Sequence, residues 1–132
     1  MGNNWKFHHV AVVVRDMDKA VEYYQSLGIG IIEPEFIDAG CKFRNVQMGS
    51  MILELVQPIE GESAEKEFLN KRGEGVHHIG YSVDDFDKET AKLAEKGVSI
   101  IIGGKIPTGG GWAYFDTRKG GNVIIELIQW GK

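Results

Sequence analysis

The sequence has little cysteine, no long apolar segment and no surplus of positive charge. Its single cysteine, Cys41, cannot form a disulfide within the chain, so nothing calls for an oxidising compartment. No apolar run approaches the roughly 20 residues that cross a bilayer, and the first residues lack the apolar core of a signal peptide. The net charge of −4 argues against a nucleic-acid-binding protein, because no basic stripe is present to neutralise phosphates. We therefore expect a soluble, cytoplasmic protein that binds neither nucleic acid nor membrane.

Length and composition favour a single globular domain built from short elements. The chain has 132 residues, and 42% of them are hydrophobic, which is enough for a core. Its 18 glycines indicate many tight turns, and this favours strands over long helices.

The two halves of the sequence resemble each other. FHHVAVVVRDMDKAVEYYQSLGI (7–29) aligns with VHHIGYSVDDFDKETAKLAEKGV (76–98), and GSMILELVQP (49–58) aligns with GNVIIELIQW (121–130). A double histidine, two aspartates, a glycine, a glutamate and a glutamine recur at matching positions. The pattern indicates one module of roughly 65 residues written twice.

Each module is expected to fold in the order βαβββ. The double-histidine runs are β-rich and bounded by polar residues, which is typical of strands. An aspartate can cap the helix that follows each run, and a glycine suits the left-handed residue that ends it. The candidates are Asp16 or Asp18 with Gly28, and Asp85 or Asp87 with Gly97. Further strands are expected at residues 31–37, 41–48 and 51–57, and at 99–103, 112–116 and 122–129.

The whole chain, residues 1–132, is expected to be one α+β domain. Module one occupies about residues 5–60, a connecting helix about 61–75, and module two about 76–132. Ser63 can cap the connecting helix. The charged run at its start, EGESAEKE, is expected to be a solvated surface.

The alternation of side chains along a strand separates the two histidines of each pair. His8 and His77 share a face with bulky residues and are expected to be structural. His9 lies with Ala11, and His78 lies with Gly80 and other small residues. Small side chains leave room for a ligand, so His9 and His78 are the better site candidates.

Glu54 and Glu126 each lie inside an almost wholly apolar strand, MILELV and VIIELI. An unpaired carboxylate buried there would cost several kcal/mol. If only one strand had such a glutamate, an ion pair with a lysine or arginine would be a sufficient explanation. Because the same histidine and glutamate recur in both modules, a divalent cation shared by two imidazoles and two carboxylates is the stronger interpretation.

With these repeated elements, the sequence resembles the vicinal oxygen chelate superfamily, the glyoxalase/bleomycin-resistance/dioxygenase proteins. The resemblance extends over HHVAVVVRDMDKAVEYYQSLGI, MILELVQP, HHIGYSVDDFDKETAKLAEKGV and WAYFDTRKGGNVIIEL. It implies two tandem βαβββ modules that form a half-open, mixed β-barrel around one divalent metal ion, such as Co, Ni, Zn, Mn or Mg. The implied ligands are His9, Glu54, His78 and Glu126, and this complete set argues against the metal-free antibiotic-binding branch.

Several branches of the superfamily remain open. Methylmalonyl-CoA epimerases are similar through the double histidine, the run ELVQP and the single-domain length. Glyoxalase I has a similar ligand set, but its glutathione-anchoring arginine and asparagine would fall near Val13 and Pro58. Some epimerases have a glutamate base near the position of Phe43, so that base does not transfer. Extradiol dioxygenases usually have a histidine where Glu54 stands.

The resemblance implies an enzyme that removes a proton next to a carbonyl group of a small-molecule substrate. Glu126 or Glu54 would shuttle the proton. The first hypothesis is a metal-dependent epimerase or isomerase, for example on an acyl-CoA such as methylmalonyl-CoA. The alternatives are a lyase similar to glyoxalase I and a non-catalytic protein that binds a small molecule such as an antibiotic. A homodimer is expected.

Overall fold

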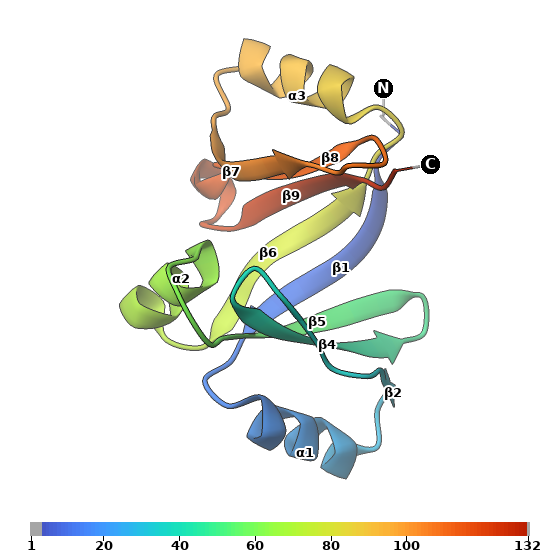
Figure 1. Ribbon diagram of the computed structural model, residues 1–132, viewed down its shortest axis with the longest axis vertical. Helices are drawn as coiled ribbons and strands as arrows, with labels where there is room; N and C mark the ends of the chain where they lie inside the picture. Colours follow the sequence, from blue (N-terminus) through green and yellow to red (C-terminus); the bar gives the residue numbers. More distant parts are fainter. Residues whose placement is uncertain (1–3, 132) are drawn as a thin grey trace. The chain divides into compact units, whose positions relative to one another are not determined.

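The computed structural model describes residues 4–131, which divide into two compact units. The first unit comprises residues 9–77. The second unit comprises residues 4–8 together with residues 78–131. Figure 1 shows the elements of the chain in sequence order. Within residues 4–131, no helix combines the length and the apolar character that a membrane span requires.

The first unit contains a mixed arrangement of strands and two helices. Its elements are β1 (Lys6–Val13, which begins in the second unit), α1 (Met17–Leu27), β2 (Ile31–Ile32), β3 (Phe36–Asp38), β4 (Cys41–Met48), β5 (Met51–Pro58) and α2 (Ala64–Arg72). The strand order is β2-β4-β5-β1, and β3 also pairs with β4. β1 runs parallel to β5, whereas the other pairs are antiparallel.

The second unit repeats this topology. Its elements are β6 (Gly75–Ser82, which begins in the first unit), α3 (Phe86–Glu95), β7 (Ile100–Lys105), β8 (Gly111–Phe115), the short 3-10 helix η1 (Arg118–Gly120) and β9 (Ile124–Gln129). The strand order is β6-β9-β8-β7, with β6 parallel to β9 and the other pairs antiparallel. The predicted α+β class and the βαβββ order of each half are therefore confirmed.

Matching residues start the helix of each unit. The Asp16 side chain caps α1 by accepting a hydrogen bond from the backbone N–H of Lys19, and Asp85 caps α3 in the same way. The side-chain oxygen of Gln57 accepts the N–H of Met17, and that of Gln129 accepts the N–H of Phe86, both at 2.7 Å. The repeated glutamines therefore bind otherwise unsatisfied helix N–H groups to the last strand of their own unit.

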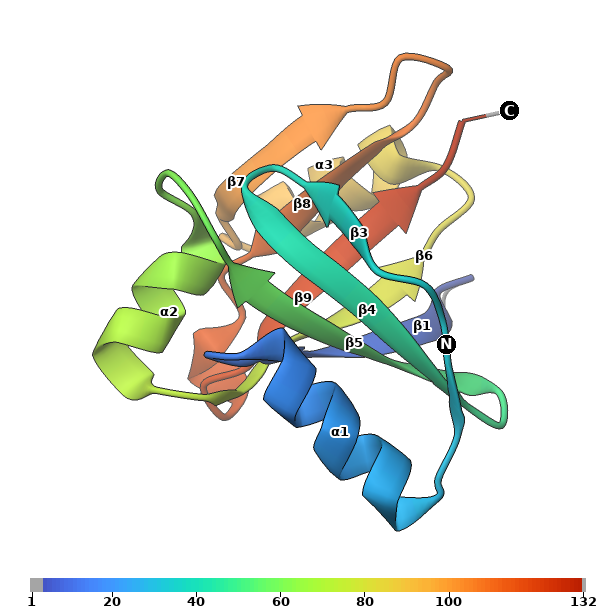
Figure 2. The same ribbon diagram turned by 60° about the horizontal axis from the view of Figure 1, so that its bottom comes forward.

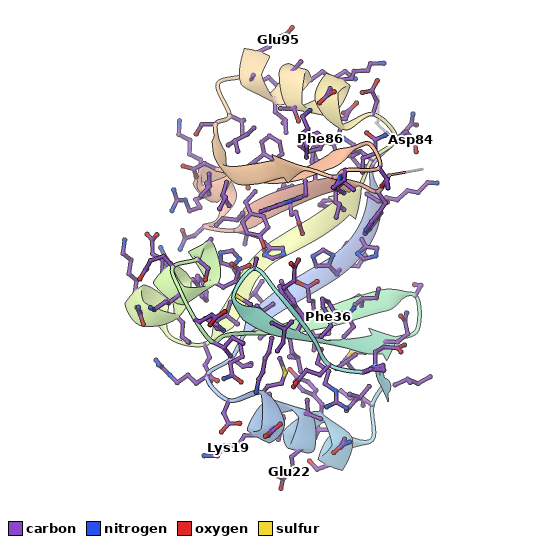
Figure 3. The ribbon with its side chains drawn as sticks, viewed as in Figure 1. Lys19, Glu22, Phe36, Asp84, Phe86 and Glu95 are labelled. Carbon is purple, nitrogen blue, oxygen red and sulfur yellow. The ribbon has the colours of Figure 1, made fainter. Side chains whose placement is uncertain are left out.

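Each unit has its own core between its helix and its strands. In Figure 2, α1 covers one face of β4 and β5, and Figure 3 shows Phe86 pointing from α3 toward the strands while Lys19 and Glu22 point outward from α1. The first core contains Val14, Met17, Val21, Val46, Leu53 and Leu55. The second contains Val83, Phe86, Ala113, Phe115 and Leu127. Val10 and Val12, which share a face of β1 with His8, pack against the first core.

Some predicted boundaries differ from the structure. The strand expected at residues 31–37 is broken into β2 and β3 around Pro34, which has no N–H to donate to a sheet. The left-handed glycines predicted to end the two helices are confirmed. Gly28, the C-cap of α1, has φ of 68°, and Gly97, which directly follows the C-cap Lys96 of α3, has φ of 80°. Ser63 does cap the connecting helix α2.

Residues 4–8, at the start of the described chain, pack within the second unit. Trp5 and Phe7 pack on Tyr81 with ring centroids 5.6 and 6.0 Å away, and Trp5 Nε1 donates a hydrogen bond to Glu89 Oε1 at 2.8 Å. These contacts explain why residues 4–8 form part of the second unit.

Candidate functional site

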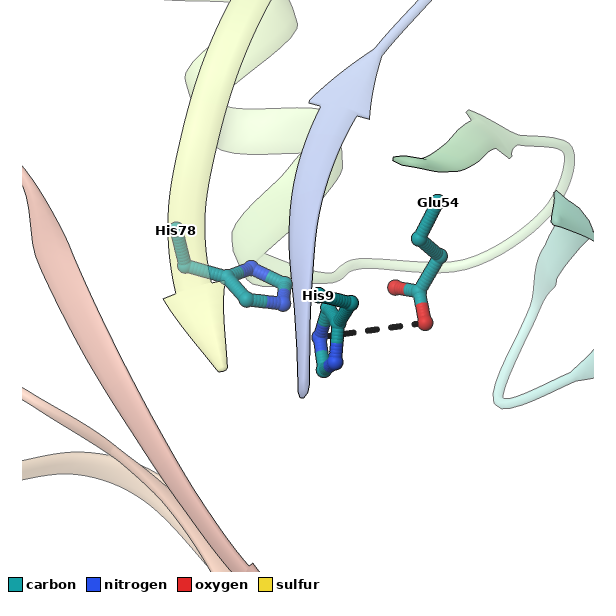
Figure 4. A group of neighbouring side chains, drawn as sticks. All are labelled: His9, Glu54 and His78. Atoms are coloured by element: carbon teal, nitrogen blue, oxygen red, sulfur yellow. Dashed lines mark ion pairs between the residues drawn. The ribbon is translucent and has the colours of Figure 1, made fainter. Parts of the chain in front are cut away.

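His9 and Glu54 lie close together in the first unit. His9 is on β1 and only 4% exposed, and Glu54 is in the middle of β5. β1 and β5 are parallel and in a register that places Ala11 beside Glu54. Because Ala11 has only a methyl side chain, the glutamate reaches toward His9, two residues earlier on the same face. His9 Nε2 and Glu54 Oε2 are 3.8 Å apart (Figure 4).

His78 and Glu126 repeat this arrangement in the second unit. His78 on β6 is fully buried, and Glu126 on β9 is 8% exposed. The parallel register of β6 and β9 places Gly80 beside Glu126, at the position of Ala11. His78 Nε2 and Glu126 Oε1 are 3.3 Å apart. One histidine and one glutamate of the four candidate ligands therefore lie close together within each unit.

The donor chemistry of each pair fits a divalent cation. Ligand atoms about 2.0–2.2 Å from a metal ion lie roughly 3–3.5 Å from one another in tetrahedral or octahedral geometry. The separations of 3.3 and 3.8 Å are near this range. Imidazole nitrogen with carboxylate oxygen, without thiolate, suits a borderline or hard metal. Each pair can thus supply half of a four-ligand set.

A third side chain faces each glutamate from the neighbouring antiparallel strand. Asn45 on β4 is directly opposite Glu54, and Tyr114 on β8 is directly opposite Glu126. The Tyr114 ring is 4.6 Å from that of His78, with the planes tilted by 35°. Sequence reasoning did not select Asn45, because its position beside Glu54 depends on the register of the β4–β5 hairpin.

The first histidine of each double pair contacts aromatic rings. His8 lies 4.8 Å from the Trp130 ring in the second unit. His77 is buried in the first unit, with its ring edge-to-face against Phe68 at 5.2 Å. These contacts agree with the structural role expected for both.

The charged run before α2 is not wholly a solvated surface, and that prediction was wrong for Glu65. This residue is only 6% exposed, and one of its carboxylate oxygens lies within 4.8 Å of a ring nitrogen of His77. It is in the first turn of α2, whereas its neighbours Glu62 and Lys66 form an ion pair on the surface.

Cys41 is a buried thiol with no sign of reactivity. Its sulfur lies 3.9 Å from Ser63 Oγ, and it packs with Ala11 and Val56. Burial, followed by the nearby negative charge of Glu65, raises the pKa of the Cys41 thiol. The group therefore stays protonated and poorly nucleophilic at neutral pH.

Lys105 and Arg118 are exposed cations that already form local ion pairs. Lys105 Nζ is 2.9 Å from Asp87, and Arg118 Nε is 2.8 Å from Asp116. The first part of the glycine-rich segment before Trp112 completes β7, and the rest turns into β8.

Comparisons with known proteins agree with this architecture. A model of the glyoxalase/bleomycin resistance protein/dioxygenase superfamily matches residues 8–115. Mitochondrial methylmalonyl-CoA epimerase from Bos taurus is 32% identical over 132 residues, covering 96% of this chain and 75% of that protein. Ethylmalonyl-CoA/methylmalonyl-CoA epimerase from Cereibacter sphaeroides is 30% identical over 130 residues, covering 94% and 97%. The crystal structure of methylmalonyl-CoA epimerase from Mycobacterium tuberculosis superimposes with a TM-score of 0.79 at 25% identity, covering 96% and 89%.

Proposed function

Because this chain belongs to the glyoxalase/bleomycin resistance protein/dioxygenase superfamily, we propose that it is a metal-dependent epimerase of an acyl-CoA such as methylmalonyl-CoA. Two relatives that cover nearly the whole chain are epimerases of such thioesters. The observation that carries the proposal is the buried histidine–glutamate pair that recurs at matching positions of both units.

We further propose that all four side chains, those of His9, Glu54, His78 and Glu126, hold one divalent cation in a single domain. Two observations support this. Each pair alone supplies only two ligands, fewer than the three or four protein ligands of a typical catalytic site. In addition, both carboxylates are largely buried, and one cation would stabilise the negative charge of both.

The proposed chemistry is the removal and return of a proton next to the thioester carbonyl. The bound cation would supply a positive charge that stabilises the negative charge developing on the substrate oxygen. The carboxylate of Glu126 takes the proton, because it is the more enclosed of the two glutamates. Glu54 is the second candidate for this role. Return of the proton to the opposite face of the carbon inverts its configuration.

A glyoxalase I-like lyase is the second candidate, but one observation weighs against glutathione as its substrate. The glutathione-anchoring arginine expected near position 13 is replaced by Val13, which is fully buried in the first unit. A non-catalytic binding protein is the third candidate. It would need no stoichiometric metal, so metal content distinguishes it from the two enzymes.

The adjacent histidines provide matched controls for a metal test. We expect purified protein to contain about one equivalent of a divalent metal by elemental analysis. His9→Ala and His78→Ala should each weaken metal affinity at least tenfold. His8→Ala and His77→Ala remove neighbouring imidazoles and should retain the metal. Equal metal loss in all four variants, with circular dichroism unchanged, would contradict the proposed ligand set.

Solvent exchange then tests the reaction. The wild-type protein in D₂O should incorporate deuterium at C2 of methylmalonyl-CoA, detected by NMR. Protein that binds its metal but catalyses no exchange with methylmalonyl-CoA or ethylmalonyl-CoA would refute the epimerase assignment.

A further inference from the structure

Asn45 presents a buried polar atom on the same face of the sheet as Glu54. Residues directly opposite on antiparallel strands have Cβ atoms about 5 Å apart and point to the same side. Asn45 and Glu54 form such a pair, and Ala11 occupies the corresponding position on β1. The three residues form one row across the first unit, with the small alanine at one end.

The Asn45 amide oxygen is buried, and no group within residues 4–131 donates a hydrogen bond to it. Buried amide oxygens in folded proteins nearly always accept a hydrogen bond, because desolvation without a partner is unfavourable. Thr90 in α3 has the only other such side-chain atom among the described residues. Thr90 is in the helix α3, whereas Asn45 is in a strand and directly opposite Glu54.

We propose that Asn45 is a substrate-positioning residue whose amide oxygen accepts a hydrogen bond from an N–H or O–H group of the bound thioester. This inference rests on the proposed function, because it requires the substrate to lie beside Glu54. An amide does not take up protons near neutral pH, so Asn45 orients the ligand and leaves proton transfer to a glutamate. The Asn45 amide oxygen has no hydrogen-bond donor among the described residues of the free protein, and a bound ligand with an N–H or O–H group would supply one.

Two variants with matched chemistry separate this role from a structural one. Asn45→Leu keeps the approximate shape of the side chain and removes the polar group. Thr90→Val does the same at the other unpartnered atom. Both should raise the melting temperature of the metal-free protein, by about 3 °C, because an unsatisfied buried polar atom is removed.

Ligand affinity should distinguish the two. Isothermal titration with an equilibrated mixture of methylmalonyl-CoA epimers should give at least a tenfold larger Kd for Asn45→Leu and an unchanged Kd for Thr90→Val. Asn45→Ala is the second variant if Asn45→Leu does not fold. The ethanethiol ester of methylmalonate, which lacks the pantetheine amides, locates the donor. If Asn45→Leu loses affinity only for the CoA ester, the donor is in the pantetheine arm. If it loses affinity equally for both esters, the donor is at the reacting end of the substrate.

The inference is overturned if Asn45→Leu binds methylmalonyl-CoA as tightly as the wild type, or if its melting temperature falls while that of Thr90→Val rises. Wild-type protein that binds no methylmalonyl-CoA would overturn the proposed function, and this inference with it. Wild-type binding combined with normal binding by Asn45→Leu would remove the inference alone.

Discussion

The two units use one backbone plan but surround their histidine–glutamate pairs differently. In the first unit, the pair is 3.8 Å apart, the Glu54 side chain is 17% exposed, and a polar Asn45 faces it. In the second, the pair is 3.3 Å apart, the Glu126 side chain is 10% exposed, and the Tyr114 ring faces it. The two units have thus kept the same candidate ligand types, histidine and glutamate, while the neighbours of these residues differ. We infer a division of labour, in which the second pair does the proton chemistry and the first pair positions the ligand.

The largest expected effect tests this division. Glu126→Gln should reduce the rate of deuterium incorporation into methylmalonyl-CoA about 10³-fold, because it removes the proton acceptor but keeps an oxygen and the side-chain shape. The reduction in rate caused by Glu54→Gln should be smaller than that caused by Glu126→Gln by a factor of at least ten. Metal content measured on the same preparations controls for loss of the cation. The reverse order would assign the proton to the first unit.

The next comparison concerns the start of each double-histidine strand. Trp5, before β1, packs on Tyr81 and donates a hydrogen bond to Glu89. The matching Glu74, before β6, is exposed and accepts a hydrogen bond from the N–H of Arg15. Trp5→Ala should lower the free energy of unfolding by about 3 kcal/mol. Trp5→Phe should cost about 1 kcal/mol, because it loses the hydrogen bond but keeps the ring contact.

Glu74→Ala is the matched change on the other strand, and it should cost less than about 0.5 kcal/mol, because water can replace an exposed partner. Urea denaturation measures all three variants. A similar cost at Trp5 and Glu74 would mean that the aromatic contacts add little.

Because the sequence contains an internal repeat, much of this fold could be predicted from the sequence. The self-alignment predicted the topology. The alternation of small and bulky residues around His9 and His78, and a glutamate inside each apolar strand, selected the four residues that form the two histidine–glutamate pairs. These signals are local or periodic. Gln57 and Gln129 were aligned as a matching pair, but their role was not evident, because it depends on where the last strand passes the start of the helix.

Other features depended on long-range partners or on register. No pattern in the sequence near Trp5 indicates that its ring packs on Tyr81, which is 76 residues later in the chain. From the sequence, Asn45 has no feature that distinguishes it from other strand residues. Only the register of the β4–β5 hairpin shows that it lies opposite Glu54. Glu65 was misjudged because its neighbours are charged and exposed, and only the packing of α2 reveals its burial. The break at Pro34, in contrast, follows from a residue type and was predictable.

Substitution of Gln57 and Gln129 tests whether the same hydrogen bond contributes equally to the stability of the two units. Gln57→Ala and Gln129→Ala should each lower the free energy of unfolding by about 1 kcal/mol, because each leaves a helix N–H without its acceptor. Gln25→Ala, on the exposed side of α1, should be nearly neutral. Unequal costs at Gln57 and Gln129, measured by urea denaturation, would indicate that one helix start has a substitute partner.

The smallest expected effect lies in the turns that lead into the last strand of each unit. Gln47 donates to the carbonyl of Gly49 at 2.8 Å, whereas Asp116 pairs with Arg118 at 2.8 Å. Hydrogen bonds from Arg118 lower the pKa of Asp116 to about 2, from the ordinary value of 3.8. Since the folded-state pKa is the lower one, the stabilisation is present above about pH 4 and is lost as the pH falls through 2.

Asp116→Asn should therefore lower the melting temperature by only about 1 °C at pH 7, because an exposed ion pair contributes little. The difference from wild type should narrow as the pH falls below 4, and it should shrink in 1 M salt. Gln47→Ala should produce a change that depends on neither pH nor salt, because no charge is involved. A pH-dependent difference for Gln47→Ala, or a constant one for Asp116→Asn, would show that the ion pair does not distinguish the two turns.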